Sequence, residues 1–199
     1  MALIDVYPVE SIPTEAWRNG GGTTRTIATG GTQWRVSLAS IERNGPYSRF
    51  PGIARVSLIL GGDGVTLTSS ETVVQLRPWV PEAYDGDLDW DAALVDRPSI
   101  ALNVMATKGR YLVDVRIVDE PVVVGPGRAA IAVALGPGCT YAEGGDAPAG
   151  DLLPGHVLVS ERQDRPLLLA PRGATCGKPE RCACAALATI ESAPAQELS

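Results

Sequence analysis

Two apolar runs of the sequence carry polar side chains at alternate positions, and a third carries one polar side chain. Arg35 and Ser37 stand two residues apart in one run, Arg55 and Ser57 in a second, and Asn103 lies in a third. Because successive side chains of a β-strand point to opposite faces, each Arg-x-Ser pair shares one face of its strand. If these faces line a barrel interior, an arginine there can bind a carboxylate through two hydrogen bonds. The pattern therefore predicts a binding site for a small-molecule carboxylate.

The same alternation also fits a sheet with one face in solvent, which is the commonest reason for polar residues at every second position of a strand. The two readings differ in whether the polar faces meet in a cavity. The residue pattern by itself leaves both open.

The segment Trp17–Arg25 contains three consecutive glycines. Glycine allows a positive φ angle and a close approach of the backbone to another group. The segment is not a phosphate-binding loop, because it lacks a Gly-Lys-Ser/Thr sequence, a preceding strand and a following helix. A flexible turn is one interpretation, and a polar pocket rim formed by Asn19, Thr24 and Arg25 is the other.

The segment Asn44–Gly52 lies between the two Arg-x-Ser runs and carries two aromatic residues, Tyr47 and Phe50. It is longer than a tight hairpin and is stiffened by two prolines. A loop of this kind can cover the mouth of a pocket, and it can equally be a packed corner.

An enzyme that works without a metal is the main alternative to a binding protein. Asp85, Asp87 or Tyr84 could supply its acid or base, although Asp-Gly is also a strong signal for an exposed turn. The only histidine, His156, excludes a site with several imidazole ligands. It would also have to be the base of any Ser-His-Asp triad, and no G-x-S-x-G sequence is present.

The cysteines offer one further alternative, a structural zinc site. Cys176, Cys182 and Cys184 are close in sequence, and Cys139 and His156 are additional potential ligands. Their spacing differs from the paired C-x2-C pattern of strong zinc sites, so we favour free thiols or an adventitious disulfide over zinc. We predict no metal and no cofactor.

Runs rich in Val, Ile, Leu and Thr, bounded by Gly, Pro, Asp or Asn, are typical of antiparallel strands. The predicted strands are Trp34–Ile41, Ile53–Leu60, Val65–Thr68, Thr72–Leu76, Ile100–Ala106, Tyr111–Val118, Ala129–Leu135, His156–Val159 and Leu167–Ala170. Only Pro13–Trp17 and Pro179–Ile190 have helical character. The sequence thus predicts an all-β sandwich or barrel with little helix.

A plausible joint at 119–126 divides the chain into unequal parts. We expect a first barrel with the glycine-rich segment in 1–120, a shorter second barrel packed on it in 121–191, and a frayed tail in 192–199. Unpaired strand edges would favour a homodimer.

The net charge of the 199-residue chain is −6, and its isoelectric point is near 4.8. Such a chain repels phosphate backbones and anionic lipid headgroups, so we expect no nucleic-acid or membrane partner. Long apolar runs and a basic start are lacking, so we expect neither a membrane span nor a signal peptide. Without an export signal, we expect a cytoplasmic protein whose cysteines are reduced thiols.

The order of several segments resembles the HutD/Ves family of the cupin superfamily. The segments that carry the resemblance are Trp17-x-Asn19-Gly20-Gly21-Gly22-x-Thr24-Arg25, Trp34-Arg35-Val36-Ser37, Gly45-Pro46-Tyr47-Ser48-x-Phe50-Pro51-Gly52 with Arg55, Gly62-x-Gly64, Tyr84-x-Gly86-Asp87 and Leu102-Asn103-x-Met105. The resemblance implies two double-stranded β-helix (cupin) barrels, a bicupin. It implies no usual cupin metal, because the histidines of that motif are missing.

The resemblance also implies a role in histidine utilisation, as a regulator that binds a small pathway metabolite. Polar positions shared by the family match Asn19, Arg25, Arg35, Ser37, Arg55 and Asn103. We therefore expect a non-enzymatic binding protein in which the arginines hold a carboxylate and Tyr47 or Phe50 closes the mouth. The alternative is a metal-independent isomerase or hydrolase acting on a small carboxylate.

Overall fold

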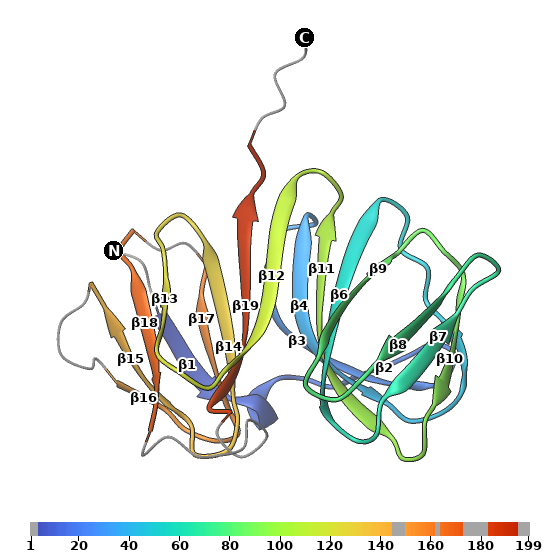
Figure 1. The fold of residues 1–199 in the computed structure, drawn as a ribbon, viewed down its shortest axis with the longest axis horizontal. Coiled ribbons are helices and arrows are strands. Elements are labelled where there is room, and N and C mark those ends of the chain that lie inside the picture. Colours follow the sequence, from blue (N-terminus) through green and yellow to red (C-terminus); the bar gives the residue numbers. More distant parts are fainter. Residues whose placement is uncertain (1–3, 145–149, 162–163, 173–182, 195–199) are drawn as a thin grey trace, which may run out of the picture.

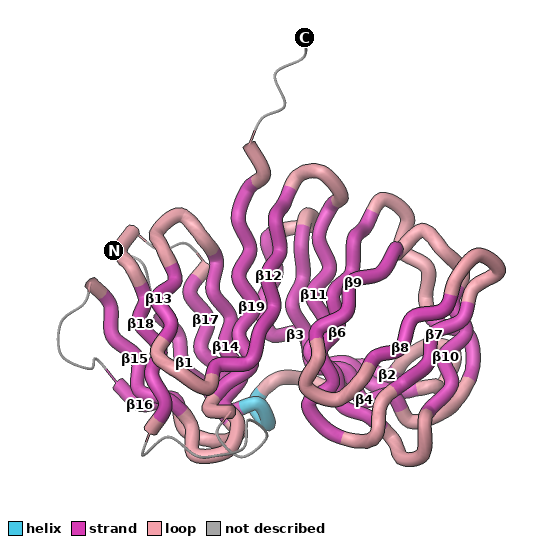
Figure 2. The backbone as a smooth tube through the Cα atoms, in the orientation of Figure 1, coloured by secondary structure: helices cyan, strands magenta, loops and turns pink. Residues whose placement is uncertain are grey.

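The computed structural model describes residues 4–144, 150–161, 164–172 and 183–194. Nearly all regular structure in these residues is β-strand, and the one helical element described is a single 3-10 turn, η1 (Val9–Ser11) (Figure 2). The all-β prediction is confirmed. None of the described residues forms a helix long and apolar enough to cross a membrane.

Ten strands form the first barrel from two antiparallel sheets. The larger sheet has the order β2-β3-β4-β11-β6-β9, and the smaller has the order β5-β10-β7-β8. The strands are β2 (Glu15–Ala16), β3 (Gly22–Gly30), β4 (Trp34–Ile41), β5 (Gly45–Tyr47), β6 (Ile53–Gly61), β7 (Val65–Thr68), β8 (Val73–Leu76), β9 (Pro81–Asp85), β10 (Trp90–Leu94) and β11 (Ser99–Thr107).

Nine strands form the second barrel. Its sheets have the orders β1-β17-β14-β19-β12 and β13-β18-β15-β16. The strands are β1 (Ile4–Pro8), β12 (Tyr111–Val118), β13 (Val122–Val124), β14 (Ala129–Ala134), β15 (Cys139–Glu143), β16 (Gly150–Leu152), β17 (His156–Ser160), β18 (Leu167–Pro171) and β19 (Ala185–Ser192).

Two strands that precede residue 120 belong to the sheets of the second barrel. Strand β1 pairs with β17, and β12 pairs with β19 along its whole length. The division at 120 expected from the sequence therefore does not coincide with the boundary between the sheets. Pairing partners distant in sequence decide which sheet a strand joins, and the local pattern of a strand does not name its partner.

The two barrels repeat one strand order. Strands β4-β11-β6-β9 and β5-β10-β7-β8 of the first barrel correspond to β12-β19-β14-β17 and β13-β18-β15-β16 of the second, each shifted by eight strands. Strands β2 and β3 extend the first barrel, and β1 extends the second. This strand order requires only alternating apolar residues and turns. The two barrels can therefore share it without similar sequences.

The six-stranded and five-stranded sheets pack against each other in the middle of the molecule (Figure 1). Val36, Leu58 and Leu102 from the first barrel share this core with Ile131 and Val157 from the second. The apolar face of the Arg-x-Ser strands thus joins the two barrels. Because side chains alternate along a strand, the opposite, polar face of these strands is directed into the first barrel.

The helix predicted for Pro179–Ile190 is wrong in its described part. Residues 179–182 lie outside the described residues, and Ala185–Ser192 is strand β19, hydrogen-bonded between β14 and β12. Ala186 and Ala188 face the core between the barrels, whereas Ala185 and Leu187 face the interior of the second barrel. Burial on both faces overrides the helical preference of alanine, which is weak for each residue.

The segment Pro13–Trp17 is not helical either. Glu15 and Ala16 form the short edge strand β2, which pairs with β3, and the only helical turn nearby is η1. All nine runs predicted as strands are strands in the structure.

Candidate ligand-binding site

Strand β11 lies between the two strands that carry the Arg-x-Ser pairs. Met105 is opposite both Arg35 of β4 and Arg55 of β6. In the next row, Asn103 is opposite both Ser37 and Ser57. Residues opposite one another on neighbouring strands share a face of the sheet. The sheet therefore aligns two arginines and a row of smaller polar side chains on its inner face.

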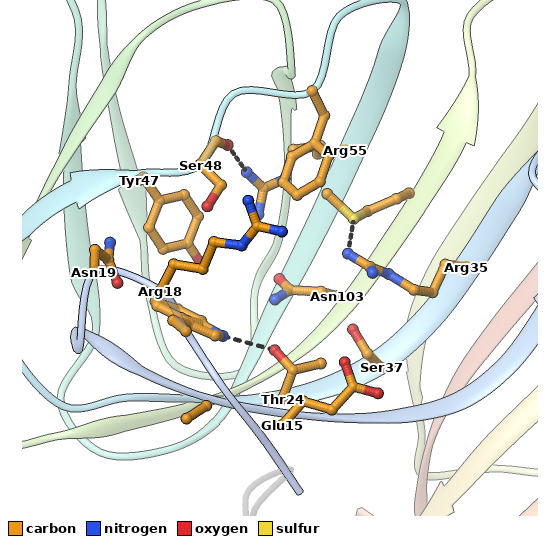
Figure 3. A pocket seen from close by; sticks show the side chains of 14 residues that line it. Glu15, Arg18, Asn19, Thr24, Arg35, Ser37, Tyr47, Ser48, Arg55 and Asn103 are labelled. Atoms are coloured by element: carbon orange, nitrogen blue, oxygen red, sulfur yellow. Dashed lines mark hydrogen bonds between the residues drawn. The ribbon is translucent and has the colours of Figure 1, made fainter.

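These side chains line a cavity of about 520 Å³ in the first barrel (Figure 3). This volume lies within the range of about 300–1,000 Å³ that is typical of small-molecule sites. The lining residues are Glu15, Ala16, Trp17, Arg18, Asn19, Thr24, Arg35, Ser37, Tyr47, Ser48, Phe50, Arg55, Asn103 and Met105. The polar faces thus meet in a cavity, which excludes the solvated-sheet interpretation for these strands.

Arg55 is buried among aromatic rings. It is 5% exposed, and its guanidinium carbon lies 4.7 Å from the ring centre of Tyr47, 4.9 Å from that of Tyr84 and 5.3 Å from that of Phe50. One guanidinium nitrogen, Nη1, donates a hydrogen bond of 3.2 Å to the carbonyl oxygen of Ser48. Its Nε is buried and has no hydrogen-bond partner among the described residues.

Arg35 reaches the same cavity from the other side of β11. Its Nη2 donates to the sulfur of Met105 at 3.1 Å, and its guanidinium carbon lies 5.7 Å from the ring centre of Phe50. The Nε of Arg35 is also buried without a partner among the described residues. Sulfur is a weak acceptor, so the hydrogen-bonding capacity of this guanidinium is largely unused.

No described carboxylate forms an ion pair with Arg35 or Arg55. Glu15 and Arg18 also line the cavity, and both are exposed at its rim. The lining therefore carries three arginines and one glutamate in a protein whose net charge is −6. A buried cation without a counter-charge is unfavourable, and an anionic ligand would relieve this cost.

Neutral donors stand beside the arginines. Asn103 Oδ1 accepts a hydrogen bond from Ser57 Oγ, so the amide NH2 group is the donor that Asn103 presents, and this group lies near the Tyr47 hydroxyl. The Tyr47 hydroxyl is buried without a partner among the described residues, and burial raises the pKa of Tyr47. Tyr47 therefore stays protonated near neutral pH and can donate a hydrogen bond.

The glycine-rich segment forms one wall of the cavity. Thr24 Oγ1 accepts a hydrogen bond from Trp17 Nε1 at 2.7 Å, and Asn19 Nδ2 donates to the carbonyl oxygen of Pro46 at 2.6 Å. Gly20 has a φ angle of 67°, and a Cβ atom on Gly22 would lie 2.0 Å from the Ser40 carbonyl oxygen. Glycine is therefore required for both the turn and the close approach. Asn19 and Thr24 line the cavity while their polar groups hold this wall in place.

Arg25, predicted as a rim residue, does not line the cavity. On β3 it is opposite Leu38, which packs against the core between the barrels, and its Nη1 donates to the carbonyl oxygen of Ile12. Adjacent residues of a strand point to opposite faces, so Thr24 faces the cavity and Arg25 faces away from it.

Phe50 sits on a loop that is fastened to two neighbouring turns. The Phe50 amide donates to the Gly86 carbonyl oxygen at 2.7 Å, and the Gly52 amide donates to Asp87 Oδ1 at 2.7 Å. The Lys108 ammonium forms ion pairs with both Asp85 and Asp87. These contacts make the segment a packed corner, and Tyr47, Ser48 and Phe50 of the same segment line the cavity, so the two interpretations of Asn44–Gly52 are compatible.

The carboxylates considered for acid-base chemistry are therefore part of a structural clamp. The hydrogen bond from Lys108 is the main cause that holds the pKa of Asp85 and that of Asp87 below their usual range. Neither residue lines the cavity. His156 is on β17 in the second barrel and likewise has no part in it.

Several lining residues were absent from the predicted set: Glu15, Ala16, Trp17, Arg18, Ser48 and Met105. Met105 shares a strand face with Asn103, so the alternation that identified Asn103 could also have found it. Glu15 and Arg18 come from the edge strand β2 and the following turn, for which the sequence has no clear periodic signal.

The cysteines give no zinc site in the described part of the chain. Cys139 and Cys184 are buried free thiols in the apolar interior of the second barrel. Cys176 and Cys182 lie outside the described residues. Among described residues, no three His, Cys, Asp or Glu side chains are placed to hold a metal ion together.

Comparison with known proteins identifies the family. The sequence profile of the HutD family matches residues 9–176. The chain belongs to the HutD family. Protein Ves from Citrobacter koseri is 35% identical over 124 residues, which cover 59% of this chain and 65% of that protein. The chain thus matches less than two thirds of the length of this relative.

Two solved structures resemble this HutD-family chain over nearly its whole length. One is a conserved protein of unknown function, PA5104, from Pseudomonas aeruginosa, with a TM-score of 0.79, 22% identity and coverage of 96% and 98% of the two chains. The other is HutD from Pseudomonas fluorescens in a formate condition, with a TM-score of 0.75, 22% identity and coverage of 96% and 100%. At this identity they establish the shared cupin-like fold alone.

Proposed function

We propose that this HutD-family protein is a non-enzymatic binding protein for a small carboxylate metabolite and acts as a cytoplasmic regulator in histidine utilisation. One observation carries the proposal: Arg35 and Arg55 line one cavity, each has a buried Nε without a hydrogen-bond partner among the described residues, and neither forms an ion pair with a described carboxylate.

The surroundings of Arg55 favour tight binding of a carboxylate. Three aromatic rings exclude water from its guanidinium, and charge-assisted hydrogen bonds strengthen as the local dielectric falls. The guanidinium groups of Arg35 and Arg55 make this part of the cavity cationic. Asn103 and Tyr47 add neutral donors, and none of these groups has to transfer a proton.

A thermal-shift titration tests the proposal. The compounds are formate, acetate, glutamate and metabolites of the histidine pathway, each compared with its methyl ester or amide where one exists. At 100 times its dissociation constant, a ligand stabilises the protein by about 2.7 kcal/mol, which corresponds to several degrees of Tm. We expect carboxylates, and not the neutral analogues, to raise Tm.

The matched variants are Arg55→Met in the cavity and Arg128→Met in the second barrel. Both remove one positive charge, and Arg128 is a half-exposed residue paired with Glu191. We expect Arg55→Met to abolish the shift and Arg128→Met to retain it. Carboxylate binding that survives Arg55→Met, or wild-type protein that binds no carboxylate at 10 mM, roughly the weakest useful range, would reject the proposal.

A further inference from the structure

A second cavity adjoins the arginine site. It has a volume of about 340 Å³ and is lined by Thr29, Gly31, Thr32, Gln33, Trp34, Arg35, Phe50, Ile53 and Met105. Arg35, Phe50 and Met105 also line the first cavity, so the two spaces meet at these three side chains. We call the second space the apolar groove, because its larger side chains other than Arg35 and Gln33 are those of Trp34, Phe50, Ile53 and Met105.

The walls of the apolar groove are held in place by contacts that do not depend on a ligand. The carbonyl oxygen of Gln33 accepts hydrogen bonds from the Thr107 amide at 2.9 Å and from its hydroxyl at 3.0 Å. These bonds tie the β3–β4 turn to the end of β11. The Trp34 indole packs against Gly30, where a Cβ atom would lie 2.0 Å from Nε1. The groove is therefore preformed, which lowers the entropy cost of binding.

The chemistry changes sharply from one cavity to the other. The first cavity contains the guanidinium of Arg55, the Tyr47 hydroxyl and the Asn103 amide. Among the described residues that line it, the apolar groove has no acidic side chain, and Arg35 at the junction is the one cationic side chain. A carboxylate bound by both arginines would leave the rest of its molecule facing Phe50 and Met105.

We infer that the ligand is an amphipathic carboxylate, whose head group binds Arg35 and Arg55 and whose apolar chain or ring lies in the groove over Phe50, Met105 and Ile53. This inference rests on the proposed function, because it requires the carboxylate to bind at the arginines. It goes further by naming the chemical class of the remainder of the ligand. Each methylene removed from water contributes about 0.8 kcal/mol, equivalent to about a fourfold gain in affinity.

A homologous series of carboxylates tests the inference in the wild-type protein. Dissociation constants are measured by calorimetry for formate, acetate, butyrate, hexanoate and 3-phenylpropionate, with hexylamine as a control of opposite charge. We expect affinity to rise by up to about fourfold for each methylene that enters the groove, and hexylamine not to bind.

The variant Ile53→Asn tests where the chain lies. Ile53 lines the groove and not the first cavity. We expect Ile53→Asn to flatten the dependence of affinity on chain length and to leave the formate affinity unchanged. The matched control is Leu112→Asn, at an exposed position of the second barrel, which should change neither.

The two hypotheses fail in different ways. If formate and acetate bind through Arg55 but longer chains bind no better, the amphipathic ligand is rejected and the carboxylate site stands. If hexylamine binds as tightly as hexanoate, the groove acts independently of the arginines, and the inference is also rejected. If no carboxylate binds, the proposed function fails, and the inference fails with it.

Discussion

The two barrels share one strand order and differ in what fills them. Strands β4, β11 and β6 of the first barrel direct Arg35, Asn103 and Arg55 inward, around a cavity. The corresponding strands of the second barrel are β12, β19 and β14, and the side chains that enter its closed core include Val118, Leu187 and Ala132. Topology therefore does not determine whether a barrel of this protein can hold a ligand.

The difference can be traced to side-chain volume and polarity on one face of each sheet. Leu152, Leu158, Leu167 and Leu169 are 0% exposed and fill the second barrel between its two sheets. In the first barrel, an apolar cluster around Leu67 and Leu76 fills only part of the interior. A carboxylate site inside a barrel needs both space and unpaired cations. Among the described residues, the interior of the first barrel has both, whereas that of the second is filled by apolar side chains.

The largest effect on stability should come from placing an arginine, as in the first barrel, in the interior of the second barrel. Ala132 of β14, the strand that corresponds to β6, is 0% exposed and opposite Leu158 and Leu187. Ala132→Arg would bury an unpaired charge among the apolar side chains that surround Ala132 in the second barrel. We expect a loss of more than about 4 kcal/mol of folding free energy, measured by urea unfolding.

The matched control is Val123→Arg at an exposed position of the same barrel, which should have little effect. A folded Ala132→Arg protein with nearly normal stability would show that the second barrel is not closed.

Much of this contrast is visible in the sequence, because period-two alternation shows which side chains share a face. The alternation places Arg35 and Arg55 on one face of their strands and Val36 and Leu58 on the opposite face. The alternation does not show that β11 lies between the two arginine strands, since strand order is set by contacts between distant segments. The pairing of Met105 with both arginines makes that arrangement explicit.

The errors have a common physical cause, which is that local preference is weaker than tertiary packing. The alanines of β19 favour a helix locally, yet their small side chains suit a central strand buried on both faces. Arg25 lies next to Thr24 in a polar segment, but the regular alternation of β3 turns it away from the cavity. The glycine-rich segment hid the start of β3, because Gly22 is needed for close backbone contact inside a strand.

A smaller effect is expected when the first barrel is made more like the second. Arg55→Met replaces a buried cation with an apolar side chain of similar length. Loss of the cation-π contacts is offset by removal of the unpaired charge, so the free energy of unfolding should stay within about 1 kcal/mol of the wild-type value or rise. Urea unfolding without ligand measures this. A loss of more than about 3 kcal/mol would instead make Arg55 a structural residue of the barrel core.

The smallest effect concerns the clamp that fastens the Phe50 loop. Lys108→Met removes both ion pairs to Asp85 and Asp87 and should loosen the loop, which weakens carboxylate binding by roughly threefold. Arg97→Met is the matched control, because it removes an exposed ion pair with Asp63 elsewhere in the first barrel. Calorimetric titration with hexanoate should show weaker binding in Lys108→Met and unchanged binding in Arg97→Met. Equal affinities in wild type and both variants would show that the clamp does not influence ligand binding.

The clamp also predicts a dependence on pH. The pKa of Asp85 and that of Asp87 lie below the ordinary value of 3.8, and the pKa of Lys108 lies above 10.5. For the carboxylates, stabilisation is present above the unfolded-state pKa and is lost as the pH falls through the lower folded-state pKa values. For the ammonium group, stabilisation is present below 10.5 and is lost as the pH rises through the higher folded-state value. The Tm difference between wild type and Lys108→Met should therefore persist from about pH 5 to pH 9 and vanish at strongly acidic pH. All three groups of the clamp keep their charges between pH 5 and pH 9. A Tm difference that changed within this range would therefore mean that another group titrates near the loop.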